Sequence, residues 1–273
     1  MMYKQAIVCA VLLLAFMFTA PAPAQAAVVE ITATVKSDFN KTTAAADSKL
    51  SADLNRNYSS LASLQEQDTD WEAKIGEIHK RNEEEMKLLR KQIQQIDAAA
   101  VGRLQTEVNA AKEKYKPLFE EYTALNKQIK AVKPLKNKDL NAMLQMQADV
   151  MKVAVSLARE EIRAKEASLK TVKDQKNRTM KTIRGTLAET EPVYVKIKAE
   201  KSAISTSKKS IDTEWKNFKL HIKNRDAKSA SSSLTSLVSL SKKIVDKKQN
   251  IYSLEQKISE IIVKAKQQMP KYS

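Results

Sequence analysis

The chain has 273 residues, of which 48 are Lys or Arg, 32 are Asp or Glu, only three are glycine and only one is cysteine. So few glycines exclude a fold with many tight turns, and one cysteine excludes a disulfide framework. Ala, Lys, Leu, Glu, Gln and Met dominate, and these residues favour helices. We therefore expect an all-α protein of long helices, held together by helix packing alone.

Residues 1–26 have the order of a secretory signal peptide. Lys4 precedes an apolar run from Ala6 to Phe18, and small residues with prolines lead to Ala24-Gln25-Ala26. The run is short against the roughly 20 residues that span a bilayer, which argues against a retained anchor. We expect cleavage after Ala26, with Ala24 as the alternative, and a bacterial product that is secreted or associated with the cell envelope. Cys9 would be removed with the peptide, which leaves no thiol chemistry.

Apolar residues spaced by three or four positions predict two long helical arms. Residues 27–46 lack this pattern and are expected to be a flexible segment. The first arm covers 47–133. Its apolar side chains form a narrow row along one face of the helix, which we call a seam and which includes Met86, Leu89, Ile93 and Ile96. Since the spacing is sustained over many heptads, it favours coiled-coil packing, and another helix is the expected partner of the seam.

The best chain reversal is residues 134–138, where Pro134 and Asn137 combine a helix breaker with a capping residue. A second arm follows over 139–223, with a seam that includes Leu140, Leu144 and Leu157, and a shorter third helix follows over 227–267. The expected fold is an elongated antiparallel helical hairpin or coiled coil, with the third helix packed back on it. Pro117 and Pro192 would each kink or break an arm.

Searches for catalytic chemistry in the sequence find little. His79 and Glu83 are four residues apart on one helical face and make at most half of a metal site. The sequence has no glycine-rich phosphate loop and no nucleophile elbow. Helices with only a narrow apolar face also form few pockets that exclude water. We expect no catalytic residue, no metal, no cofactor and no small-molecule substrate, and therefore not an enzyme.

Polar residues on or beside the first seam have a structural interpretation. Asp68, His79 and Asn82 would weaken the packing but fix its register, and a hinge is the alternative. Asp68 also begins the sequence "DTDWE", which would act as a cap or a local break. The uncharged stretch 229–241, "SASSSLTSLVSLS", favours burial between helices over insertion at a membrane interface, because it lacks aromatic and lysine residues.

Charge is distributed unevenly along the chain. Residues 27–100 hold 10 basic and 13 acidic groups, whereas 101–273 hold 37 and 19, a net charge of +18. Such asymmetry indicates an anionic partner for the second part, and a solvated lysine-rich face is the alternative. The expected anion-contact residues cluster at the reversal and along the second arm: Lys130, Lys133, Lys136, Lys138, Lys173, Lys176, Arg178, Lys181 and Arg184.

These observations favour an exported, non-enzymatic coiled-coil protein that acts as a structural or binding rod in the cell envelope. Its expected partner is an anionic wall polymer or lipid headgroups, and the seams leave homo-oligomers open. Nucleic acid is excluded as a partner because export would remove the protein from it. Two alternatives stay open: a periplasmic or extracellular holdase chaperone, and a coiled-coil regulator of a cell-wall hydrolase.

Overall fold

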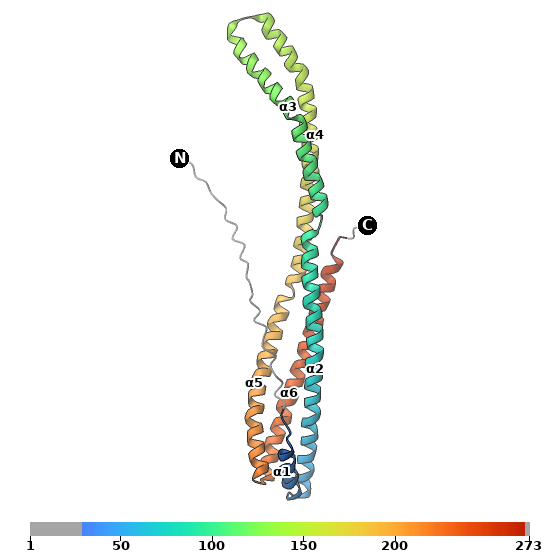
Figure 1. Cartoon of the computed structure of the whole chain (residues 1–273), viewed down its shortest axis with the longest axis vertical. Coiled ribbons are helices and arrows are strands. Elements are labelled where there is room, and N and C mark those ends of the chain that lie inside the picture. Colours follow the sequence, from blue (N-terminus) through green and yellow to red (C-terminus); the bar gives the residue numbers. More distant parts are fainter. Residues whose placement is uncertain (1–28, 271–273) are drawn as a thin grey trace, which may run out of the picture. The chain divides into compact units, whose positions relative to one another are not determined.

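A computed structural model of the chain describes residues 29–270 (Figure 1). The predicted signal peptide, its cleavage site near Ala26, and Cys9 lie outside the described residues. Within 29–270 every regular element is helical, which confirms the predicted all-α class. The elements are α1 (Ala33–Ala44), α2 (Ser48–Gln95), α3 (Ala98–Val132), the 3-10 helix η1 (Lys133–Leu135), α4 (Lys138–Ala188), α5 (Glu191–Lys223) and α6 (Ala227–Gln267).

Short polar side chains cap several of these helices. Thr32 accepts a hydrogen bond from the Val35 backbone N–H at 3.3 Å and starts α1. The Asn137 side chain accepts one from the Leu140 N–H at 3.1 Å and starts α4, directly after η1. Each cap satisfies a backbone donor that would otherwise lack a partner in the first turn.

The two prolines behave differently. Pro117 lies inside α3, which continues through it, and the interruption of the first predicted arm falls instead between Gln95 and Ala98. Asp97 adopts a left-handed φ of 51° there, a conformation that Asp tolerates better than most residues. Pro192 is the second residue of α5, where its missing N–H has no intrahelical partner to lose. The "DTDWE" stretch forms neither a cap nor a break, because α2 is continuous through it.

The helices contribute to two compact units, which we describe separately. Unit 1 consists of residues up to 70 together with 204–246, and unit 2 consists of 71–203 together with 247 onwards. Three helices, α2, α5 and α6, each supply residues to both units.

Unit 1 is built around an aromatic cluster. The Phe39 ring stacks on Tyr58 with 4.4 Å between centroids and contacts Phe218 at 6.3 Å, and Phe218 in turn stacks on Trp215. Thr42 donates its hydroxyl to the Ile222 carbonyl at 2.8 Å. The segment 27–46, expected to be flexible, therefore contains a packed helix, α1, whose Phe39 is almost fully buried.

The small-residue stretch 229–241 lies in α6 within unit 1. Its burial, predicted from the sequence, is confirmed for Ala230, Ser233, Leu234, Leu237 and Ser241. Ser and Ala side chains allow neighbouring helices to approach closely, while the leucines supply the apolar contact.

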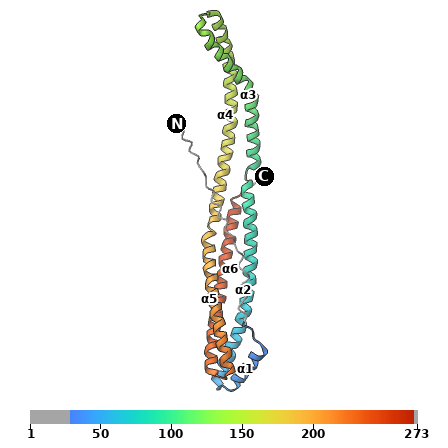
Figure 2. The same ribbon diagram turned by 60° about the vertical axis from the view of Figure 1, so that its left-hand side comes forward.

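Unit 2 contains the α3–α4 pair, which runs side by side in both views (Figures 1 and 2). Side-chain contacts show that the pair is antiparallel, because residue numbers rise on α3 as they fall on α4. The contacts join Gln105 to Lys173, Lys112 to Glu166, and Tyr115 to Glu161. The buried core of this unit includes Ile78, Leu89, Ile183, Ile258 and Ile262.

Candidate anion-contact surface

Four lysines surround the turn between α3 and α4. Lys130 lies in the last turn of α3, Lys133 lies in η1, Lys136 follows it and Lys138 begins α4; all four are exposed. Within the described chain none of them forms an ion pair with a carboxylate, and Asp139 is the adjacent acidic residue. We call these four residues the tip lysines. Because their ammonium groups are fully hydrated and uncompensated, they present a concentrated positive charge to solvent.

The other five predicted basic residues lie further along α4. Lys173, Arg178, Lys181 and Arg184 are exposed, and Lys176 is half-buried. Lys173 donates a hydrogen bond to the Gln105 amide oxygen at 3.0 Å, and the structure shows no ion pair for any of the five among residues 29–270. At 3.6 residues per turn, Lys173, Lys181 and Arg184 lie on one face of the helix, and Arg178 lies to the side of that face.

The nine residues therefore form two separate patches. One is the group of tip lysines, and the other, which we call the lower patch, consists of the five basic residues from Lys173 to Arg184. Lys138 and Lys173 are separated by 35 residues of continuous helix, about 50 Å at 1.5 Å per residue. Between the two patches, charged side chains of α4 form ion pairs with oppositely charged side chains of α3. The Glu166 carboxylate lies 2.6 Å from the Lys112 ammonium, and Glu107 lies 3.7 Å from Lys165.

Glu161 and Tyr115 extend this neutral section. The Tyr115 hydroxyl donates a hydrogen bond to Glu161, and this bond lowers the pKa of the carboxyl, with help from the nearby Lys114 charge. The same hydroxyl and carboxylate raise the pKa of Lys114, chiefly through its hydrogen bond to Tyr115. The charged forms of Glu161 and Lys114 are therefore both favoured, and their charges cancel. This part of the α3–α4 pair adds no net charge and separates the tip lysines from the lower patch.

A second polar cluster lies buried in unit 2 around Glu255. Its side chain is fully buried and accepts hydrogen bonds from the Asn82 amide at 2.9 Å and from His79 Nδ1 at 2.8 Å. Asn82 also donates to the Glu255 backbone carbonyl at 2.9 Å. The predicted polar positions His79 and Asn82 thus meet a third residue that the sequence analysis missed. The signal was available, because Glu255 lies between Ile251 and Ile258 at core spacing.

Charges around this cluster shift the pKa of His79. The hydrogen bond that His79 donates to Glu255 raises it most, and the charges of Glu255 and Glu83 also raise it, while burial and the Lys201 charge act in the opposite direction. Glu83 is 3.5 Å from His79 Nε2. Burial raises the pKa of the neighbouring Tyr194 hydroxyl. The cluster joins α2 to α6 through polar contacts that only one register of the two helices satisfies.

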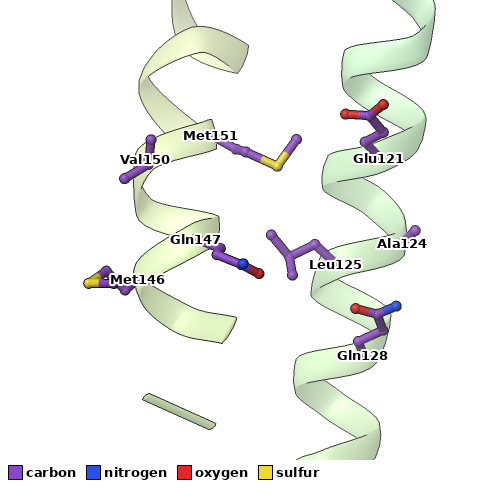
Figure 3. Close-up of a pocket in the computed structure, with 8 residues that line it drawn as sticks. All are labelled: Glu121, Ala124, Leu125, Gln128, Met146, Gln147, Val150 and Met151. Atoms are coloured by element: carbon purple, nitrogen blue, oxygen red, sulfur yellow. The ribbon is translucent and has the colours of Figure 1, made fainter. Parts of the chain in front are cut away.

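Among residues 29–270, no group of three or more His, Cys, Asp or Glu side chains is placed to hold a metal ion. The helices of this part of the chain are also not long and apolar enough to cross a membrane. Two shallow grooves lie in unit 2: one on α3 alone, and one between α3 and α4 that is lined by residues including Leu125, Met146 and Val150 (Figure 3).

No protein-family model matches the chain, and comparison with curated proteins and with solved structures finds no significant similarity.

Proposed function

We propose that the protein is an exported, non-enzymatic coiled-coil protein that acts as a binding rod in the cell envelope and contacts anionic wall polymer or lipid headgroups. The observation that carries the proposal is the group of four tip lysines, which are exposed and lack ion-pair partners. The lower patch on α4 supplies a second contact of the same sign. Polyanions are attracted to such surfaces without any need for a shaped pocket.

The proposal includes a finer description of the fold: an elongated antiparallel hairpin of coiled-coil arms, with α6 as a third helix. Helix length supports it, since α4 alone has 51 residues and a length of about 75 Å at 1.5 Å per residue. Small-angle scattering of the chain tests this description. A maximum dimension below about 60 Å would contradict arms of this length.

Cosedimentation tests the anion contact. The full chain is mixed with vesicles containing phosphatidylglycerol, or with isolated anionic wall polymer, and the variant carries Lys133→Glu, Lys136→Glu and Lys138→Glu. We expect the variant to lose most of the binding, because attraction becomes repulsion at the tip, and to keep its helicity, because all three side chains are exposed.

A matched control reverses three exposed lysines of α5 in unit 1: Lys209, Lys216 and Lys219. It changes the net charge by the same amount, so it separates a local contact from a general effect of charge. Equal loss of binding in both variants would show that the tip has no special role.

A further inference from the structure

Helix α4 carries an apolar stripe that no described part of the protein covers. Its five side chains are exposed over half to nearly three quarters of their surface: Met143 (50%), Met146 (66%), Val150 (72%), Val153 (63%) and Leu157 (67%). Successive members are three, four, three and four residues apart, the spacing of core positions in a coiled coil. Leu157, predicted to lie in the second seam, is therefore outside it.

The stripe is distinct from the face of α4 that packs against α3. That face buries Ala148, Val155, Ala158 and Ile162. Val155 follows Val150 by five residues, which places it about 140° further round the helix. Because α4 has apolar residues on two nearly opposite faces and α3 covers one, the second face lacks a helical neighbour.

A shallow groove borders the stripe on the side of α3. Met146 and Val150 belong to both, and Leu125 projects from α3 toward Met151 across the groove (Figure 3). A helix laid along the stripe would place side chains in this groove, as knobs enter holes in a coiled coil. Three of the positions that flank the stripe, Ala142, Ala154 and Ser156, are small and uncharged and permit close approach.

We propose that this surface docks a second copy of the same chain, with the two α4 helices antiparallel. The stripe has the heptad spacing of a core row, so two copies related by a two-fold axis supply knobs and holes to each other. The contact is formed by the two α4 helices, and α3 of each copy lies on the other face of its own α4. The proposal does not depend on anion binding.

Charge determines the direction of the pairing. In a parallel pair the tip lysines of both copies would lie together and repel. In an antiparallel pair the tip lysines of the two copies lie at opposite ends of the contact, which avoids this repulsion, and Lys138 comes near the level of the Glu160–Arg163 ion pair of the second copy. Acidic residues also border the stripe, with Asp139 and Glu160 near its ends and Asp149 at its edge. They disfavour an anionic bilayer as the occupant of this face.

Sedimentation equilibrium of the full chain tests the association. We expect the wild-type chain to form dimers, and the double variant Met146→Glu with Val150→Glu to raise the dimer dissociation constant by about tenfold or more, since it places charges in the apolar contact. Circular dichroism should show unchanged helicity, because both residues are exposed. The matched control is Val195→Glu with Leu220→Glu, whose side chains have similar exposure, 68% and 55%, but lie outside the stripe.

A chain that stays monomeric at high concentration would overturn the proposal, and so would equal weakening by the two double variants. A monomer that binds an unfolded test protein or vesicles through Val150 would assign the stripe to a different partner and would also overturn it.

Cross-linking tests the direction in a Cys9→Ser background, which removes the only native thiol. A flexible thiol cross-linker should join Met143→Cys chains to Leu157→Cys chains in a mixture, but should not join either variant to itself. Val150→Cys, near the middle of the stripe, should cross-link to itself and serves as the positive control. Efficient self-linking of Met143→Cys would contradict the antiparallel arrangement.

Discussion

Replacing Glu255 by alanine removes the acceptor at the centre of the buried cluster in unit 2. Two hydrogen bonds are lost: the one from Asn82 at 2.9 Å and the one from His79 at 2.8 Å. Hydrogen bonds to charged groups contribute about 1.5–3 kcal/mol each, but the carboxylate no longer has to be buried, which returns part of this energy. We expect unit 2 to lose about 3 kcal/mol of stability toward unfolding.

Urea denaturation measures this loss when it is followed through Trp71. In unit 2 the Trp71 ring packs edge-on against Tyr252 at 5.5 Å, and a Trp215→Phe background removes the other tryptophan. The midpoint should fall by about 1 M urea. Glu260→Ala, on the exposed face of the same helix, is the control and should change the stability by less than about 0.5 kcal/mol. A Glu255→Ala midpoint no lower than that of the control would refute the assigned role of the cluster.

The same cluster predicts a pH dependence with a definite sign. The pKa of His79 is raised above its ordinary value of 6.5 in the folded protein, chiefly by the hydrogen bond with Glu255. Protonated His79 therefore stabilises the fold fully below about pH 6.5, and this contribution is lost as the pH rises through the folded pKa. Glu255→Gln should flatten the stability curve as the pH rises above about 6.5. A curve with the wild-type slope would mean that another group titrates in this range.

Three further substitutions test the packing and the caps by urea or thermal unfolding. Phe39→Ala should destabilise unit 1 by about 3–5 kcal/mol because it empties the aromatic cluster, and an unchanged stability would mean that α1 does not pack there. Asn137→Ala should cost about 1 kcal/mol through the lost cap of α4, whereas Asn137→Asp should be nearly neutral; equal effects would contradict a capping role. Lys248, 2% exposed and 2.6 Å from Glu72, should tolerate Lys248→Met within about 1 kcal/mol, because an apolar chain of similar size avoids burying a charge; a loss of more than about 3 kcal/mol would show that the polar contacts of Lys248 stabilise the unit.

Local sequence patterns predicted the helices well and the chain's interruptions less well. Ile93 and Ile96 are buried as their spacing indicated, and Asn137 caps α4 because a capping residue acts on its own neighbours. The break before α3 had no such signal: Ile96 and Asp97, the latter in a left-handed conformation, separate α2 from α3, while the stronger breaker, Pro117, is accommodated inside a helix. Packing outweighs the intrinsic cost of proline there.

Contacts between residues far apart in sequence account for the remaining differences. Helix α1 has 12 residues, too few for stability on its own, and it is held by Phe218 and Ile222, which lie about 180 residues away. The sequence also could not show which apolar face of α4 meets α3, since Val155 and Leu157 belong to rows of equal regularity. Eight of the nine predicted basic residues lie on exposed surface and Lys176 is half-buried, but their division into two patches required knowing that Glu107 and Glu161 neutralise the section between them.

The central claim, that the tip lysines bind an anionic surface, is tested most directly by the salt dependence of binding to phosphatidylglycerol vesicles. Charges that act through solvent are screened over about 8 Å at physiological salt and over about 3 Å at 1 M. We predict strong binding at low salt, steep loss as salt rises, and little binding at any salt by the chain with Lys133, Lys136 and Lys138 reversed to glutamate. Binding that persists at molar salt, or that the reversed chain retains at low salt, would contradict the claim.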